Sequence, residues 1–310
     1  MRIVYVLERT DQLWGGVKVA LTDANWLQAA GHDVTVVSRT VAPPWMELRC
    51  GFRQIPGLEP RSLPEAEIYI GTFWTTVPSA AAAAALRGAA CVHFCQGYEG
   101  NAAEFAEHRH RIEQIYRLPG VHHVTISQHL TELLGQKFGI RAAEVPNAID
   151  HDVHFPGTRD AARSRIRVGL VGPYEVPLKG IRTGIEACRL AEMAGQQIEL
   201  VRVTNTGKSA AEGAQQFPVE WHQRKKPTEM GDIYRSLDVF LGTSNGVEEG
   251  FSLPAVEAMA CGVPCVLTDI PCYRAHGNTS YALFVPADDA AAMAEALVLA
   301  ARVPEIGDSL

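Results

Sequence analysis

The sequence predicts an α/β protein of two doubly wound, Rossmann-like domains that face each other across a cleft, residues 1–155 and 156–310. The chain has 310 residues, of which 47% are hydrophobic, and this suits two cores better than one. Short apolar runs alternate with segments of helical periodicity, which predicts parallel sheets covered on both faces. The alternation breaks near residues 150–165, rich in His, Asp, Pro, Gly and Arg, and then restarts. We therefore expect the hinge in that stretch.

The first half opens on RIVYVLE, residues 2–8, a buried run that predicts a strand. A loop with two glycines follows, and then an apolar repeat of helical spacing over 17–31 that ends in Gly. An alanine-rich helix is predicted over 79–90. Further short apolar runs predict strands at 32–38, 67–72, 90–95 and 122–127.

The second half repeats this pattern from a new buried strand, IRVGLVG, at residues 166–172. A loop and a helix over 180–195 come next. The alternation then continues with strands predicted at 197–204, 238–244, 264–269 and 281–286.

Composition excludes several classes of function. The net charge is −7 and neither half is basic, so no nucleic-acid partner is expected. No run approaches the roughly 20 apolar residues of a membrane span, so no transmembrane segment is expected. Seven cysteines without a CxxC pair indicate core thiols in a reducing cytoplasm, with peripheral attachment at the inner face of the membrane left open. The paired histidines lack a third ligand at a recognisable spacing, so neither a metal nor a cofactor is expected.

Two glycine-bearing loops follow the first strands of the two halves. Gly15 and Gly16 would let the backbone approach a ligand, although a tight turn alone is the more economical explanation, and the motif is not GxGxxG. Gly172 ends the other strand, and Lys179 stands at a helix start, where it can neutralise a phosphate. The alternative for Lys179 is a solvated side chain.

The stretch EEGFSLPAVEAMACG, residues 248–262, places Glu249 and Glu257 on either side of a helix start. Ser252 as a cap, a proline in the first turn and a final glycine explain the helix but not the two acids. The helix N-terminus favours a diphosphate. Glu257 can accept hydrogen bonds from a ribose diol, and Glu249 can reach hydroxyls further along. The spacing therefore describes a nucleoside-diphosphate sugar.

This stretch resembles the Glu-x7-Glu signature of family 4 of the retaining glycosyltransferases, which have the GT-B fold. WGGVKVALTDANWLQAAG, GPYEVPLKG and MGDIYRSLDVFLGTSNGVEEGF are similar to other parts of that family in the same order. The resemblance implies sugar transfer from a nucleoside diphosphate, with retention, to a hydroxyl of a carbohydrate, lipid-linked or small-molecule acceptor. It also implies a role in bacterial polysaccharide or glycoconjugate synthesis.

The resemblance further implies roles for individual residues. Glu257 would hold the donor ribose, Glu249 the donor sugar and Lys179 the diphosphate, while Gly16 would let the first loop close on the donor. The amide groups of residues 251–253 would face the sugar and diphosphate. The donor-binding set is then Gly15, Gly16, Gly172, Lys179, Glu249, Gly250, Phe251, Ser252, Leu253 and Glu257.

The sequence departs from the family in three places. Pro173 stands where an arginine usually pairs with the lysine of the phosphate loop. Gln96 stands in the usual place of a histidine, so that Gln96 and Glu99, or alternatively His93, would join Glu249 and Lys179 as catalytic residues. Family members often continue past the stretch DDAAAMAEALVLAARVPEIGDSL, residues 288–310, into a helix that crosses back onto the first domain, and here that helix is expected to be absent, short or formed differently.

Two other functions remain open on the sequence alone. One is a nucleotide-sugar 2-epimerase on the same fold, and the other is a non-catalytic nucleotide-sugar-binding partner subunit. The sequence does not name the base, the sugar or the acceptor.

Overall fold

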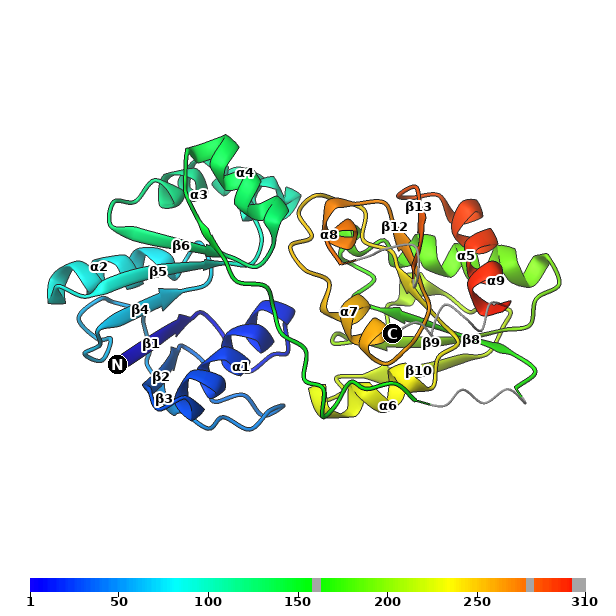
Figure 1. Ribbon diagram of the computed structural model, residues 1–310, viewed down its shortest axis with the longest axis horizontal. Coiled ribbons are helices and arrows are strands. Elements are labelled where there is room, and N and C mark those ends of the chain that lie inside the picture. Colours follow the sequence, from blue (N-terminus) through cyan, green and yellow to red (C-terminus); the bar gives the residue numbers. More distant parts are fainter. Residues whose placement is uncertain (158–162, 277–281, 303–310) are drawn as a thin grey trace. The chain divides into compact units, whose positions relative to one another are not determined.

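The computed structural model describes residues 1–157, 163–276 and 282–302. By its internal contacts the chain divides into two compact units, Met1–Asn147 and Ala148–Leu310 (Figure 1). The expected hinge at 150–165 lies partly outside the described residues, as do residues 303–310.

The first unit is built on a seven-stranded sheet in the order β3-β2-β1-β4-β5-β6-β7, with every neighbouring pair parallel. The order reverses between β1 and β4, which is the topological switch point of this sheet. The strands are β1 (Arg2–Leu7), β2 (Asp33–Ser38), β3 (Gly51–Gln54), β4 (Ile68–Gly71), β5 (Ala90–Cys95), β6 (Val121–Thr125) and β7 (Ala143–Glu144).

Four α-helices accompany this sheet in the described residues: α1 (Gly15–Ala29), α2 (Val77–Arg87), α3 (Arg109–Tyr116) and α4 (Gln128–Phe138). Two 3-10 helices, η1 (Glu99–Asn101) and η2 (Ala103–His108), precede α3. The predicted alanine-rich helix is confirmed as α2, which packs its small side chains on β4 and β5. It ends at Gly88, whose φ of 65° lies in the left-handed region that glycine adopts without steric cost.

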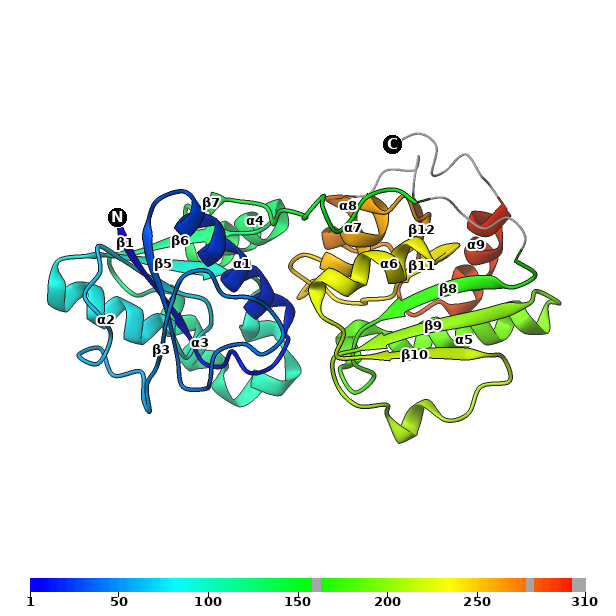
Figure 2. The ribbon, with the colours of Figure 1, turned by 90° about the horizontal axis from the view of Figure 1, so that it is seen from below.

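The second unit is built on a six-stranded parallel sheet in the order β10-β9-β8-β11-β12-β13, and Figure 2 shows β10, β9 and β8 side by side. Numbered within the unit, this is the order 3-2-1-4-5-6 of a dinucleotide-binding fold, with its switch point between β8 and β11. The strands are β8 (Ile166–Val171), β9 (Ile198–Thr204), β10 (Val219–Gln223), β11 (Val239–Gly242), β12 (Cys265–Thr268) and β13 (Ala282–Val285).

Helices cover both faces of this sheet. On one face α5 and α9 pack Ile181 and Leu297 against the apolar strand residues, and on the other α6, α7 and α8 bury Tyr234 and Met259. The bounds are α5 (Ile181–Met193), α6 (Met230–Arg235), α7 (Leu253–Ala260), α8 (Pro271–Arg274) and α9 (Ala290–Arg302), with 3-10 helices η3 (Pro177–Lys179), η4 (Ala210–Glu212) and η5 (Pro227–Glu229). The predicted pair of doubly wound α/β units is therefore confirmed.

Within the described ranges, no helix is both long enough and apolar enough to cross a membrane. The same part of the chain holds no group of three or more histidine, cysteine or acidic side chains arranged to bind a metal ion.

Candidate functional site

Two loops meet at the switch point of the second unit, one following β8 and the other following β11. Thr243 Oγ1 donates a 2.6 Å hydrogen bond to the carbonyl of Lys179, and the amide of Asn245 donates a 3.0 Å bond to the carbonyl of Leu178. Open α/β sheets bind ligands outside the carboxyl ends of their strands at such a point. We therefore expect the ligand-binding site of this unit at these two loops.

Glycine allows the two loops to approach this closely. Gly180 has a φ of 57°, and a Cβ atom there would lie 2.0 Å from the carbonyl oxygen of Thr243. Gly172 directly follows β8 and has a φ of 141°. A Cβ atom added to Gly172 would lie 3.5 Å from the Cβ atom of Lys179. Gly180 is thus required by its backbone conformation and by the close approach of Thr243, and Gly172 by its backbone conformation.

Lys179 and Glu249, one from each loop, form an ion pair with 2.6 Å between Nζ and Oε2. Ser244 Oγ donates a second 2.6 Å hydrogen bond to the same carboxylate oxygen. The Glu249 side chain is 8% exposed, whereas the Lys179 side chain is 33% exposed. A mostly buried carboxylate is therefore held by two donors, and the ammonium group keeps a face toward solvent.

Tyr273 of α8 lies beneath this pair, where its hydroxyl group interacts with Ser244 and Ser252. Burial raises the pKa of Tyr273, and the nearby Glu249 carboxylate raises it further. The phenol consequently stays protonated and acts as a neutral support for the loop that carries Glu249.

The turn into α7 brings Gly250, Phe251, Ser252 and Leu253 together, and all four are buried. Ser252 occupies the N-cap position, but its side chain makes no capping hydrogen bond, so the predicted capping role of its hydroxyl is wrong. The amide of Leu253 donates to the carbonyl of Phe251 at 3.1 Å. As predicted, Pro254 lies in the first turn and Gly262, with a φ of 73°, follows the helix end.

Glu257 lies on the same helix but faces α6. Its Oε2 accepts a 2.9 Å hydrogen bond from Tyr234 Oη and lies 3.9 Å from Nε2 of the buried His154. Burial raises the pKa of Tyr234, and the Glu257 charge adds to the effect. Glu257 is thus a buried carboxylate that already has protein partners.

Three further residues of this site were not found from the sequence. Asp288, with a φ of 60°, accepts hydrogen bonds from Asn245 at 2.9 Å and Thr183 at 3.5 Å, and so holds the loop after β11. Ser244 and Tyr273 were missed as well. The available signal was weak, because only Ser244 stands shortly after an apolar strand, while Tyr273 lies in a short helix and Asp288 in a loop.

Pro173, at the position of the family's arginine, is buried, and the nearby Arg182 is exposed. Arg202 on β9 is fully buried, and its guanidinium group bonds both carboxylate oxygens of Glu212, at 2.9 and 3.3 Å. This arginine also donates to backbone carbonyl groups within the sheet. Arg202 therefore links β9 to η4, the 3-10 helix that carries Glu212.

In the first unit, Gln96 contacts the glycine loop. Gln96 Nε2 donates a 2.9 Å hydrogen bond to the carbonyl of Gly16, and a Cβ atom on Gly16 would lie 3.4 Å from Gln96 Oε1. Gly15 opens α1 with open space around its Cα. The structure thus joins two of the predicted positions, the loop after β1 and the residue directly after β5.

Glu99 and His93 have different environments. Tyr116 Oη donates a 2.9 Å hydrogen bond to Glu99 Oε2, and burial raises the pKa of Glu99 to about 7. His93 lies inside β5, fully buried, with its ring centroid 4.9 Å from that of Tyr116 and 5.2 Å from that of His123. Burial lowers the pKa of His93 to about 3, so its ring is neutral.

Residues 165–302, most of the second unit, match the family model described as Glycosyl transferases group 1. A phosphatidyl-myo-inositol mannosyltransferase of Mycobacterium leprae (strain TN) is 28% identical over 197 residues, which cover 54% of this chain and 46% of that relative. The chain thus spans less than half the length of this relative.

Solved structures match almost the whole chain. Sucrose-phosphate synthase from Thermosynechococcus elongatus has a TM-score of 0.74 at 17% identity and covers 99% of this chain and 91% of its own. HepE from Anabaena, in complex with UDP and glucose, has a TM-score of 0.78 at 13% identity, with 98% and 91% covered. Together with the two Rossmann-like units, these likenesses identify the fold as GT-B.

Proposed function

We propose that this protein is a retaining glycosyltransferase that takes a sugar from a nucleoside-diphosphate donor bound at the switch point of the second unit. The observation that carries the proposal is the Lys179–Glu249–Ser244 arrangement, built between the loops after β8 and β11. The family match over this unit supports it, as do the structure of HepE with UDP and glucose and the matched mannosyltransferase.

The charge distribution suits a leaving diphosphate. The partly exposed ammonium group of Lys179 and the N-terminus of α7 would both meet negative charge that develops on the departing phosphate. Glu249, the ion-pair partner of Lys179, would accept hydrogen bonds from donor sugar hydroxyl groups. On donor binding, the Lys179 ammonium group would then be shared between phosphate and carboxylate.

Glu249 is poorly suited to act as a nucleophile. Its Oε2 is bonded to both an ammonium and a hydroxyl group, which lowers its tendency to attack an anomeric carbon. We therefore assign retention to attack by the acceptor hydroxyl on the face from which the diphosphate leaves, with the leaving phosphate as the base.

The first unit would supply the acceptor side of the reaction. Gln96 and Glu99 are better placed for this role than His93, because they follow β5 at its carboxyl end, whereas His93 is buried inside the strand. The hydrogen bond from Gln96 to Gly16 couples that position to the loop before α1. Glu257 would bind the ribose through the carboxylate that also accepts from Tyr234.

The test is turnover with defined donors. The full chain is incubated with UDP-glucose, GDP-mannose or other nucleoside-diphosphate sugars and a panel of carbohydrate and lipid-linked acceptors, and the anomeric configuration of the product is read by proton NMR. We expect an α-linked product from an α-configured donor, with transfer lost in Lys179→Met.

Lys225→Met is the matched control, because Lys225 is also ion-paired, at 3.0 Å to Glu229, and is 35% exposed. An inverted product would contradict the mechanism. Isomerised donor sugar without an acceptor would indicate an epimerase, and binding without turnover would indicate a non-catalytic subunit.

A further inference from the structure

An open hollow of about 480 Å³ lies in the first unit at the carboxyl ends of three adjacent strands. Glu8 and Arg9 follow β1, Arg39 and Thr40 follow β2, and Pro56 follows β3, and these five residues line it. The hollow thus lies at the carboxyl-end edge of the sheet, where open α/β sheets bind ligands, and beside the switch point that β1 shares with β4. The donor site proposed above lies in the other unit and does not use these residues.

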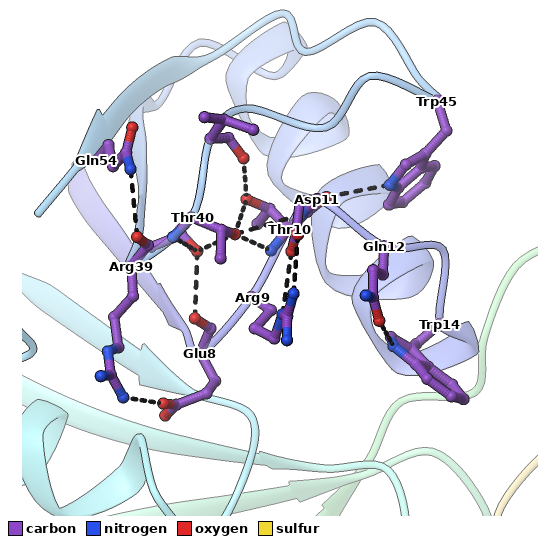
Figure 3. A network of polar contacts seen from close by, with 12 residues as sticks. Glu8, Arg9, Thr10, Asp11, Gln12, Trp14, Arg39, Thr40, Trp45 and Gln54 are labelled. Carbon is purple, nitrogen blue, oxygen red and sulfur yellow. Dashed lines mark hydrogen bonds and ion pairs between the residues drawn. The ribbon is translucent and has the colours of Figure 1, made fainter. Parts of the chain in front are cut away.

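A network of hydrogen bonds joins the loops that carry the lining residues, as Figure 3 shows. Thr40 Oγ1 accepts from the amides of Thr10, at 2.8 Å, and Asp11, at 3.3 Å. Thr10 Oγ1 donates to the carbonyl of Val41 at 2.7 Å, and the indole of Trp45 donates to the carbonyl of Thr10 at 3.0 Å. The loops after β1 and β2 are thus tied together and hold their side chains in defined places.

The one carboxylate in the lining already uses both of its oxygens. Arg39 NH1 donates to Glu8 Oε1 at 2.7 Å, and Thr75 Oγ1 donates to Glu8 Oε2 at 2.8 Å. Thr75 follows β4, so this contact spans the switch point between β1 and β4. Glu8 is therefore held in place and in turn holds the Arg39 guanidinium group from one end.

The other edge of Arg39 is available. Its side chain is 54% exposed, and its Nε and NH2 groups have no hydrogen-bond partner in the described part of the chain. Arg9, by contrast, directs its own Nε and NH2 to Asp11, at 3.1 and 2.9 Å, as Figure 3 also shows. The hollow thus carries two guanidinium groups, and one of them keeps a planar pair of donors that matches a bidentate oxyanion.

We propose that this hollow binds an oxyanion of the acceptor, a carboxylate or phosphate group, through the Nε and NH2 edge of Arg39. The inference rests on the proposed function only in naming the ligand as an acceptor carbohydrate. Arg9 lines the same hollow but is already bound to Asp11, so Arg39 supplies the available donors, and Glu8, ion-paired with Arg39 and hydrogen-bonded to Thr75, positions that guanidinium group. An acidic sugar or a sugar phosphate fits this chemistry better than a neutral sugar.

The test is direct binding of small probes to the full chain without a donor. Glucuronate, glucose 6-phosphate and glucose are compared by NMR or calorimetric titration, so that the carboxylate and phosphate arms separate the two sources of the oxyanion. We expect at least one of the anionic probes to bind at least tenfold more tightly than glucose. Arg39→Gln should remove that preference. Arg39→Lys should keep only part of it, because lysine has the positive charge but lacks the planar pair of donors of the guanidinium group.

Arg2→Gln is the matched control, since Arg2 is also 54% exposed and ion-paired, to Glu65 at 3.7 Å, but lies at the amino end of β1. It should bind the probes as the unmodified protein does. Equal binding of charged and neutral probes, or an unchanged preference in Arg39→Gln, would overturn the proposal. Separate titration with UDP distinguishes the two proposals, because donor binding should persist in Arg39→Gln, and its absence from the unmodified protein would count against the proposed function alone.

Discussion

Lys179 Nζ lies 2.6 Å from Glu249 Oε2, which joins the loops that follow β8 and β11 at the switch point of the second unit. The carboxylate is mostly buried and the ammonium group is one-third exposed. Loss of its partner should therefore cost more stability when the lysine is removed than when the glutamate is removed. Removing the lysine takes the countercharge away from a buried carboxylate, whereas removing the glutamate leaves a cation that water can reach.

A double-mutant cycle should reveal this asymmetry. We expect Lys179→Met to lower the free energy of unfolding by more than Glu249→Gln, and the double variant to be more stable than the sum of the two losses predicts. The coupling should be about 0.5–3 kcal/mol. Denaturant titration of the four proteins measures it, and additive effects would show that the pair is not coupled.

Gly180 should tolerate no side chain. A Cβ atom would lie 2.0 Å from the carbonyl oxygen of Thr243, and the φ of 57° is strained for alanine. We expect Gly180→Ala to lower stability by about 1–3 kcal/mol and to displace Lys179, with a weaker response to nucleoside diphosphates. Gly195→Ala, at a φ of 88° with no neighbouring atoms within 4 Å, isolates the backbone strain from the steric clash. Equal losses in both variants would contradict the role given to the Thr243 contact.

The carboxyl of Glu99 predicts a pH dependence of stability. Because burial raises its pKa from 4.5 to about 7, the folded protein binds more protons than the unfolded chain between these values. This contribution to stability is present below about pH 4.5 and is lost as the pH rises toward 7 and above. Each pKa unit corresponds to about 1.4 kcal/mol, so Glu99→Gln should be more stable than the unmodified protein at pH 8.

The comparison is between unfolding curves of Glu99→Gln and the unmodified protein at pH 5 and pH 8. His93 acts in the opposite direction, since its pKa is lowered to about 3 and its contribution is lost as the pH falls below 6.5. His93 is the same in both proteins, so the difference between them reports Glu99. A difference that does not grow between pH 5 and pH 8 would contradict the assignment.

Tyr234 should tune ribose binding through Glu257. Tyr234→Phe removes the 2.9 Å hydrogen bond to Glu257 Oε2 but keeps the ring in the core. We expect a stability loss of about 1 kcal/mol, and a change in affinity for UDP that is smaller for 2′,3′-dideoxy-UDP, which lacks the diol. The same change for both ligands would remove Glu257 from the ribose site.

The sequence predicted the central strands and the edge strand β13, but it missed the edge strands β3, β7 and β10. β1 is hydrophobic after Arg2, and β8 is apolar apart from Arg167, because both faces of a parallel sheet are buried. Strands β3 (GFRQ) and β10 (VEWHQ) are edge strands of their sheets and are short and mostly polar. Because β3 is largely accessible and β10 is only half-buried, neither contains a long apolar run. Their pairing depends on neighbouring strands rather than on their own composition.

Motifs identified Lys179 and Glu249, but nothing in their spacing showed that they would pair. Their sequence separation is long, and the contact arises only when the β8 and β11 loops converge at the switch point. The same applies to Gln96 and Gly16, and to Asp288, which reaches back to Asn245 from the loop before α9. Local patterns report helix starts and turns, whereas such contacts follow from strand order.

The most direct test of the central claim is thermal unfolding of the full chain with UDP, GDP, ADP and dTDP, in the unmodified protein, Lys179→Met and Lys225→Met. A ligand at 100 times its dissociation constant adds about 2.7 kcal/mol to the free energy of unfolding. We predict that at least one nucleotide stabilises the unmodified protein and Lys225→Met by this order, while Lys179→Met loses most of the effect. No stabilisation by any of the four, or equal stabilisation of all three proteins, would contradict a diphosphate site at Lys179.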